Sequence, residues 1–368
     1  MKISIDASGL GQTNTGTAVY LTQILAQWNQ DKSLAHTFVI FVAPKARHHL
    51  AALDLDERFQ LLHAPDHRLL RVLWQQTLLP DHLARLGITV HWGPGFVLPL
   101  ISHRPMVVTV HDLTFQLYPE AHEPIKRYYF PWVIRRAVDK AHTVLVVSQT
   151  TQADLHRLQP ASRHKTRVTL LGARSLPHAQ SPSPAAPGYA LFIGTLEPRK
   201  NLCNLIQAWR SLPPGVRGQT QLRIVGAKGW LIQDVLASTS QQDHIHFLGS
   251  LPDEALAAQL QGASFFVYPS LYEGFGLPVL EAMSVGIPVL TSNVGATQEV
   301  AGQAALLVDP HSQASLAQGL ARLLQEADLR AALRAAGLAR AAQFTWHKTA
   351  HQTLQALKAA ASAVATNA

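Results

Sequence analysis

The sequence predicts an α/β protein made of two Rossmann-like domains. Short apolar runs rich in β-branched residues alternate with longer helical stretches, a pattern typical of parallel sheets wound with helices. A proline- and serine-rich segment, residues 175–187, interrupts this series, which then restarts. The chain has 368 residues, of which 47% are hydrophobic, so it can fill two ordinary cores.

The expected elements follow the chain in order. Residues 1–6 are expected to form the first strand; further strands are expected at 38–42, 107–110, 144–147, 191–193, 222–225, 265–267 and 288–290. Residues 175–187 are expected to be a linker, because proline and serine at this density do not suit a core element. The two domains are then residues 1–174 and 188–344.

The charge is concentrated in the first half. The formal net charge is +8, with 19 Lys/Arg against 12 Asp/Glu in residues 1–174 and 12 against 11 in the remainder. Residues 126–136 mix cations with aromatic side chains, which suits an anionic membrane surface or an anionic acceptor. The alternative, a solvated helix face whose aromatic rings lie in the core, stays open.

Cysteine content and hydropathy favour a cytoplasmic protein. The single cysteine, Cys203, excludes an internal disulfide framework and a thiolate metal cluster, and we expect it to be a buried small hydrophobe. The N-terminus lacks the apolar region of a signal peptide, and no apolar run is long enough to span a bilayer. Peripheral attachment to the inner face of the membrane remains compatible with this pattern.

The most informative segment is residues 265–283. An apolar strand runs into Glu273 and a Gly274-Phe275-Gly276 loop, and Pro278 is expected at the first position of a helix with Glu281 in its first turn. The N–H groups and positive dipole end of that helix face the loop, whose glycines permit close approach of a ligand. This arrangement predicts a phosphate site.

Two carboxylates beside a phosphate site favour a nucleotide-sugar over a bare nucleotide. A carboxylate there is unfavourable unless it accepts hydrogen bonds from hydroxyl groups, as it would from a sugar or a ribose. The alternative is that Glu273 caps a turn and Glu281 is a first-turn acid that suits the helix dipole.

Glu273 and Glu281, with seven residues between them, resemble the paired-glutamate signature of retaining glycosyltransferases of family 4, which have the GT-B fold. The likeness continues at residues 192–202, 292–295, 299–302 and 305–310. It implies an acceptor-side first domain and a donor-binding second domain that face a central cleft, and a terminal helix, residues 345–368, that crosses back to the first domain. It also implies that Glu273 holds the hydroxyls of the donor sugar and Glu281 those of the ribose, with Gly274, Phe275, Gly276 and Leu277 lining the donor site.

Other donor-site residues follow strand ends, where open α/β sheets place ligand loops. Arg199 and Lys200 follow the first strand of the second domain, and two adjacent cations there can stabilise a departing diphosphate. His111 ends the strand 107–110, where it can donate to a sugar hydroxyl or stabilise charge; in the family this histidine reaches the donor sugar. The resemblance also assigns Gly16 a backbone contact with the phosphates and Leu251 a turn that contacts the base, and residues 224–230 look like a donor-side loop.

We expect neither a cofactor nor a metal requirement. Asp54-Leu55-Asp56 has the Asp-x-Asp pattern that binds metal in the other major glycosyltransferase fold, but no buried strand precedes it. An exposed polar turn is the expected structure there.

The predicted reaction is transfer of a hexose from a nucleoside diphosphate sugar to an acceptor hydroxyl, with retention at the anomeric carbon. Residues 111–120 and 225–230 look most like bacterial mannosyltransferases that build surface polysaccharides, which implies GDP-mannose as donor and a saccharide or polyprenyl-linked acceptor. A nucleotide-sugar epimerase and a non-catalytic sugar-binding protein are the alternatives. Nucleic-acid binding would explain the basic charge, but no recognised module supports it.

Overall fold

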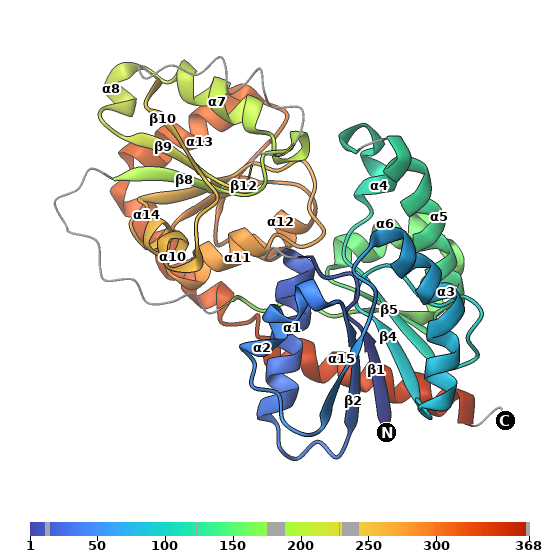
Figure 1. Ribbon diagram of the computed structural model, residues 1–368. Coiled ribbons are helices and arrows are strands. Elements are labelled where there is room, and N and C mark those ends of the chain that lie inside the picture. Colours follow the sequence, from blue (N-terminus) through green and yellow to red (C-terminus); the bar gives the residue numbers. More distant parts are fainter. Residues whose placement is uncertain (12–14, 123, 175–187, 228, 230–242, 366–368) are drawn as a thin grey trace. The chain divides into compact units, whose positions relative to one another are not determined.

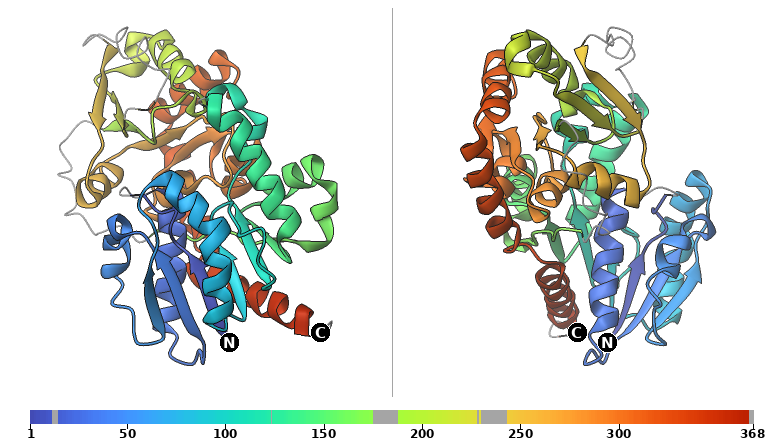
Figure 2. Two further views of the ribbon diagram at one scale, coloured as in Figure 1. Left: turned by 45° about the vertical axis from the view of Figure 1, so that its right-hand side comes forward. Right: turned by 90° about the vertical axis from the view of Figure 1, so that its left-hand side faces the viewer.

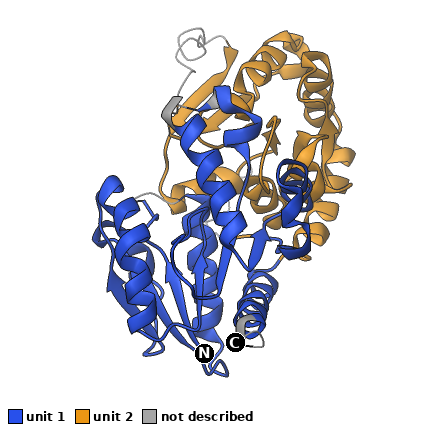
Figure 3. Ribbon diagram, turned by 90° about the vertical axis from the view of Figure 1, so that its right-hand side faces the viewer, with its two compact units in different colours: residues 1–172, 345–368 blue, residues 173–344 orange. Residues whose placement is uncertain are grey.

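The computed structural model describes residues 1–11, 15–122, 124–174, 188–227, 229 and 243–365. The chain forms two compact units, residues 1–172 with 345–368 and residues 173–344 (Figure 3). Each unit is a parallel sheet with helices, so the predicted pair of Rossmann-like domains and the return of the C-terminal segment to the first are confirmed. The predicted linker, residues 175–187, lies outside the described residues, and the facing of the domains across a cleft stays a prediction.

The first unit contains a seven-stranded parallel sheet in the order β3-β2-β1-β4-β5-β6-β7 (Figure 1). The strands are β1 Lys2–Asp6, β2 Thr37–Val42, β3 Phe59–His63, β4 Val90–Gly93, β5 Met106–Val110, β6 Thr143–Val146 and β7 Thr166–Val168. The predicted strands are β1, β2, β5 and β6. The pattern missed β3 and β7, which are partly exposed edge strands, and β4, which has only four residues and includes a histidine.

The helices of the first unit are α1 Gly16–Gln30, α2 His48–Ala51, α3 Arg68–Arg85, α4 Thr114–Leu117, α5 Pro124–Lys140, α6 Gln149–Leu158 and α15 Trp346–Ala365. They cover both faces of the sheet. Val108 of β5 packs in one core with Ile134 of α5, whereas the next residue, Thr109, shares a hydrogen bond of 3.2 Å with Tyr20 of α1. Successive residues of a strand point to opposite faces, so α1 and α5 lie on opposite sides of β5.

Helix α15 is fixed to the first unit by packing and by two hydrogen bonds. Trp28 Nε1 donates to the Ala350 carbonyl at 3.1 Å, and Thr349 Oγ1 donates to the Leu170 carbonyl at 2.6 Å. Gly172 lies against the start of the helix, where an added Cβ would come within 2.4 Å of the Trp346 backbone nitrogen. The chain's return is therefore set by close contacts in the first turns of the helix.

The second unit contains a six-stranded parallel sheet in the order β10-β9-β8-β11-β12-β13 (Figures 1 and 2). The strands are β8 Tyr189–Ile193, β9 Gln221–Val225, β10 Ile245–Gly249, β11 Phe265–Tyr268, β12 Val289–Ser292 and β13 Leu306–Val308. The helices are α7 Leu202–Ser211, α8 Pro214–Arg217, α10 Asp253–Gln261, α11 Leu277–Ser284, α12 Gly295–Ala301, α13 Gln313–Gln325 and α14 Ala327–Ala341. Every strand predicted after the interruption is present.

Two local predictions have different outcomes. The expectation that Cys203 is buried is wrong, because it lies on the exposed face of α7, opposite the buried Leu205 and Ile206. The exposed polar turn is confirmed only in part: Asp54 is exposed, whereas Asp56 is half-buried in an irregular segment and pairs with Lys32 at 2.8 Å and with Arg58 at 2.9 Å. Asp56 therefore belongs to a surface charge network with Lys32 and Arg58.

Candidate functional site

The strand order of the second sheet has a switch point between β8 and β11. From β8 the chain proceeds to β9 and β10 on one side, and from β11 it proceeds to β12 and β13 on the other. Open α/β sheets bind ligands beyond the carboxyl ends of the strands at such a point. The loop after β8 contains a 3-10 turn, Pro198–Lys200, and residues 269–276 follow β11.

These two loops bring Arg199, Lys200 and Glu273 together. Arg199 donates to Oε2 of Glu273 at 2.7 Å, and Lys200 Nζ donates to Oε1 at 2.5 Å. The hydroxyl groups of Tyr268 and Ser270 also donate to Oε1, at 2.9 and 2.6 Å. Three residues predicted from separate motifs therefore form one cluster, although Lys200 and Glu273 are 73 positions apart.

Glu197 completes this buried charge cluster. Its Oε1 lies 2.6 Å from Arg199 and 4.0 Å from Lys200 Nζ, and Lys200 also donates to the Tyr268 hydroxyl at 2.6 Å. Lys200 is 6% exposed and Glu273 8%. Two carboxylates thus neutralise two cations at the edge of the sheet, and this pairing offsets the desolvation cost of burying the four charges.

The supporting residues of the cluster were not among the predicted site residues. Glu197 precedes the predicted Arg-Lys pair by two positions, Tyr268 is the last residue of β11, and Ser270 follows it. Their positions after adjacent strands could have marked them as site residues. Which side chains they contact, however, depends on which strands are neighbours in the sheet.

The charge cluster keeps Glu273 ionised. Burial acts to raise the pKa of Glu273, but the charges of Arg199 and Lys200 and the hydrogen bonds from Lys200 and Ser270 lower it to about 2. Burial and the neighbouring Arg199 lower the pKa of Lys200, against the attraction of Glu273. At neutral pH the Glu273 carboxylate therefore accepts hydrogen bonds and has no proton to donate.

The loop before α11 requires a glycine at one position. Gly276 has a φ of 102°, which L side chains rarely adopt, and an added Cβ would lie 3.3 Å from Cγ2 of Thr297. Gly276 is also the N-cap of α11, a helix without a capping side chain among the described residues. The first N–H groups of α11 therefore remain candidates for binding an anion.

The predicted start of this helix is wrong by one residue. Helix α11 begins at Leu277, so Pro278 is its second residue and Glu281 its fifth. Glu281 consequently lies beyond the first turn, and a dipole interaction does not explain it.

Glu281 instead has a specific cationic partner. Its Oε1 lies 3.3 Å from Nε of Arg174, whose other end donates to Asp253 at 3.1 Å. Burial raises the pKa of Glu281, although the charge of Arg174 acts in the opposite direction. The surroundings therefore lower the pKa of Glu273 but raise that of Glu281. Arg174 was assigned to the first domain by the sequence, whereas the structure places it in the second unit.

The remaining predicted donor-site residues of the second unit lie in loops or at the start of a helix. The Phe275 side chain is 4% exposed and packs edge-on against Phe344, with 6.0 Å between ring centroids. Gly274 is buried, Leu277 is half-buried at the start of α11, and Leu251 lies in a third loop, between β10 and α10. Of the predicted donor-side loop 224–230, Lys228 and Trp230 lie outside the described residues.

In the first unit, His111 follows β5 in a fixed tautomer. Its Nε2 lies 2.7 Å from the Pro94 carbonyl, which can only accept, so Nε2 carries the hydrogen. Burial lowers the pKa of His111, against that hydrogen bond and the charge of Asp112. The edges of Tyr20 and Phe96 contact the ring, with centroids at 4.8 and 6.0 Å. The neutral ring is therefore committed as a donor at Nε2 and can accept at Nδ1.

Gly16 is the first residue of α1, after the capping residue Thr15, whose hydroxyl accepts from the Ala18 N–H at 3.3 Å. A Cβ at Gly16 would meet no atom within 4 Å. The described fold does not require glycine there, so the contact with a phosphate stays a prediction. Residues 12–14 of the same loop lie outside the described residues.

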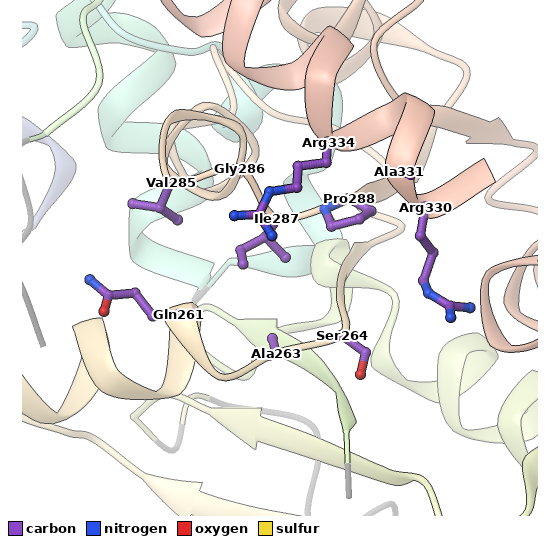
Figure 4. A pocket seen from close by; sticks show the side chains of 10 residues that line it. All are labelled: Gln261, Ala263, Ser264, Val285, Gly286, Ile287, Pro288, Arg330, Ala331 and Arg334. Atoms are coloured by element: carbon purple, nitrogen blue, oxygen red, sulfur yellow. The ribbon is translucent and has the colours of Figure 1, made fainter. Parts of the chain in front are cut away.

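A cavity of about 570 Å³ lies elsewhere in the second unit (Figure 4). Its lining includes Ser264 before β11, Pro288 before β12, and Arg330 and Arg334 of α14. It therefore lies at the amino ends of the strands, the edge opposite the charge cluster, and includes none of the predicted site residues.

Comparisons with known proteins identify the family. Residues 15–172 match the family model described as Glycosyltransferase Family 4, and residues 174–340 match that described as Glycosyl transferases group 1. The O-antigen chain mannosyltransferase B of Escherichia coli is 37% identical over 282 residues, 73% of this chain and 74% of that protein. The O-antigen chain mannosyltransferase RfbU of Salmonella typhimurium is 26% identical over 236 residues, 63% of this chain and 64% of that protein.

Solved structures share the fold. Anabaena HepE, crystallised with UDP and glucose, has a TM-score of 0.75 and 19% identity, with coverage of 98% of this chain and 100% of that one. Sucrose-phosphate synthase from Thermosynechococcus elongatus has a TM-score of 0.76 and 23% identity, with coverage of 96% and 97%. The chain therefore belongs to the glycosyltransferases of family 4 and has the GT-B fold.

Proposed function

We propose that this glycosyltransferase moves a mannosyl residue from GDP-mannose to a hydroxyl of a saccharide or polyprenyl-linked acceptor, during synthesis of a surface polysaccharide. The names of the relatives support the sugar and the pathway class, because both O-antigen relatives are called mannosyltransferases. Membership in a glycosyltransferase family favours transfer over epimerisation or simple sugar binding.

The observation that carries the chemistry is the buried charge cluster at the switch point. Breaking the bond between the sugar and the diphosphate places negative charge on the leaving group. Arg199 and Lys200 are already held by Glu197 and Glu273, so they can stabilise that charge with little reorganisation. Among the described residues, Lys200 uses two of its three N–H donors, on Tyr268 and Glu273, so one can be given to a phosphate oxygen.

The same contacts give Glu273 a binding role. A carboxylate accepts about four hydrogen bonds, two at each oxygen. Among the described residues, three donors already compete for the two lone pairs of Oε1, whereas Oε2 accepts one hydrogen bond, from Arg199. We therefore assign the donor sugar's hydroxyl to Oε2. A carboxylate with a pKa of about 2 and four donors is a weak nucleophile, which argues against a covalent intermediate on Glu273.

Retention then follows from departure and attack on the same face of the sugar. The bond from the anomeric carbon to the diphosphate breaks, the acceptor oxygen bonds to that carbon, and the acceptor's proton passes to the leaving diphosphate. Nδ1 of His111 accepts a hydrogen bond from a hydroxyl of the donor sugar. Glu281, which is paired with Arg174, accepts hydrogen bonds from the ribose hydroxyls. The proposed reaction uses no metal ion.

The first test is a thermal shift in the absence of divalent cations, with GDP, GDP-mannose, UDP-glucose and dTDP-glucose. We expect a selective response to GDP and GDP-mannose that Lys200→Ala and Glu273→Ala lose. Arg322→Ala is the control, because Arg322 makes an exposed pair on α13. A larger thermal shift with UDP-glucose than with GDP-mannose would identify UDP-glucose as the donor. No thermal shift with any nucleotide would refute the proposal.

The stereochemistry and the metal requirement need a turnover assay. Proton NMR of the first product formed from GDP-mannose is expected to show the α anomer, as in the donor, and EDTA is expected to leave the rate unchanged. A β-linked first product would exclude retention, and loss of turnover with EDTA would exclude metal independence.

A further inference from the structure

Phe96 has a backbone conformation that a bulky residue rarely adopts. Its φ is 51°, in the left-handed region. Among the described residues, the other non-glycine residues at positive φ are Asp54, Asn201 and His244. Aspartate, asparagine and histidine are the types that tolerate this region best, whereas a bulky residue there is strained. Phe96 is therefore the member of this group whose residue type does not suit its backbone.

The loop that contains Phe96 follows β4, at the switch point of the first sheet. From β1 the chain proceeds to β2 and β3 on one side, and from β4 it proceeds to β5, β6 and β7 on the other. Open α/β sheets bind ligands at the loops that follow the strands of such a point. The strained residue thus lies where the topology places a ligand, and backbone strain is concentrated at such sites.

Close contacts hold this loop in its conformation. The Phe96 N–H donates to the Thr109 carbonyl at 3.2 Å, and the Val97 N–H donates to the Gly95 carbonyl at 2.6 Å. A Cβ added to Gly93 would lie 2.4 Å from the Val97 carbonyl oxygen, so the turn closes tightly on the end of β4. The surrounding structure therefore fixes the positive φ of Phe96 and the direction of its side chain.

The ring of Phe96 lies beside His111. Their ring centroids are 6.0 Å apart, with 86° between the ring planes, and the Phe115 ring lies 6.5 Å from that of Phe96 at 85°. The same loop contributes the Pro94 carbonyl, which accepts from Nε2 of His111 at 2.7 Å. One turn therefore sets both the tautomer of His111 and the aromatic ring next to it.

The core of the first unit uses part of the Phe96 ring. The side chain is half-buried and packs against a core cluster that includes Val110 and Leu113. The backbone gains nothing from phenylalanine, because glycine or asparagine adopts a positive φ with less strain. Removal of the ring then costs much stability if the core depends on it, and little if a ligand uses its accessible part.

A hexose suits the accessible part of this ring. The face of an aromatic ring is negative, whereas the C–H groups on one side of a sugar ring are apolar and weakly positive. In the proposed function, Nδ1 of His111 accepts a hydrogen bond from a hydroxyl of the donor sugar. A sugar bound in this way comes within reach of Phe96, because the two rings are neighbours.

We propose that Phe96 contacts the hexose of the nucleotide-sugar donor, with its ring against the C–H groups of the sugar. The proposal rests on the proposed function, in which His111 binds the same hexose. Phe96 then recognises the sugar but not the nucleotide, so it distinguishes the donor from the nucleoside diphosphate product.

The test compares the binding of GDP and GDP-mannose by isothermal titration calorimetry. We expect Phe96→Asn to lower the affinity for GDP-mannose at least about fivefold, because the sugar loses an apolar contact, and to change the affinity for GDP less than about twofold. Phe96→Tyr keeps the ring and is expected to retain both affinities. The control is Phe130→Leu, which removes a ring stacked on Phe115 at 4.3 Å and is expected to leave both affinities unchanged.

Melting midpoints separate recognition of the sugar from a role in the core. The midpoint of Phe96→Asn is expected to stay within about 3 °C of wild type, because relief of the strained backbone offsets the lost ring contacts. A fall of more than about 6 °C would assign the ring to the core and overturn the proposal.

Three results of the titrations would also overturn the proposal: an unchanged affinity of Phe96→Asn for GDP-mannose, an equal loss of affinity for GDP, or an equal loss for GDP-mannose in Phe130→Leu. Binding of UDP and UDP-glucose by the wild type in place of the guanine nucleotides would refute the proposed donor. The same comparison with those two ligands would then test Phe96, so the two failures are seen separately.

Discussion

Replacing Glu273 by glutamine tests the charge cluster most directly. The substitution keeps the shape of the side chain but removes its charge. The amide must then point its NH2 group toward either Arg199 or Lys200, both of which are donors. Lys200 is 6% exposed, and in the part of the chain that the structure describes it would be left with one acidic partner, Glu197, 4.0 Å away. Glu273→Gln is therefore expected to destabilise the second unit.

The expected magnitude follows from the electrostatics of the carboxylate. Lowering of the Glu273 pKa from 4.5 to about 2 corresponds to roughly 3 kcal/mol in favour of the ionised form. For a unit of residues 173–344, a loss of this size lowers the melting midpoint by roughly 6–12 °C. Removing one partner of a buried ion pair has a comparable cost, about 3–5 kcal/mol, in other proteins.

Differential scanning calorimetry between pH 7 and pH 3.5 measures both the size of the change in melting midpoint and the sign of its pH dependence. The pKa of Glu273 is depressed in the folded state, so its stabilisation is fully present above about pH 4.5 and is lost as the pH falls toward 2. The difference between wild type and Glu273→Gln is thus expected to stay constant down to about pH 5 and then narrow. Glu326→Gln is the control, because its pair with Arg322 is exposed and is expected to shift the midpoint by less than ~1 °C.

A midpoint for Glu273→Gln within about 2 °C of wild type at pH 7 would refute the reasoning. It would mean that water or rearrangement of Arg199 compensates for the lost carboxylate. A difference that widens in acid would contradict the depressed pKa.

Three further changes test other parts of the molecule. Gly276→Ala is expected to cost about 1–2 kcal/mol in urea denaturation, because φ is 102° and the new Cβ meets Thr297; an unchanged free energy of unfolding would show that the loop relaxes. Burial lowers the pKa of His111, so the unfolded state takes up a proton at this histidine before the folded state does. The contribution of His111 to the stability of the fold is therefore fully present above about pH 6.5 and declines below it. The midpoints of wild type and His111→Gln should therefore converge between pH 7 and 5, and parallel curves would contradict this. Trp28→Phe removes the bond to the Ala350 carbonyl and is expected to cost about 1–3 kcal/mol and to speed hydrogen exchange in α15; unchanged exchange would show that packing alone holds the helix.

Local patterns determined much of the fold. Buried parallel strands read as continuous apolar runs, so β1, β2, β5, β6, β8, β9, β11 and β12 were predictable from sequence. The two partly exposed edge strands of the first sheet lacked this signal. The exposure of Cys203 was not predictable from its residue type, which gives only an average burial, because the helix face on which it lies decides its exposure.

The sequence by itself determined that there are two α/β domains, and it identified Arg199, Lys200 and Glu273 after strand ends and Glu281 in the following helix as charged residues of a donor site. The tertiary structure decided their partners. Glu273 meets Arg199 and Lys200 because β8 and β11 are neighbours in the sheet, and Glu281 meets Arg174 because that residue packs with the second unit. Strand order and packing depend on contacts between residues far apart in the chain, which local periodicity does not encode.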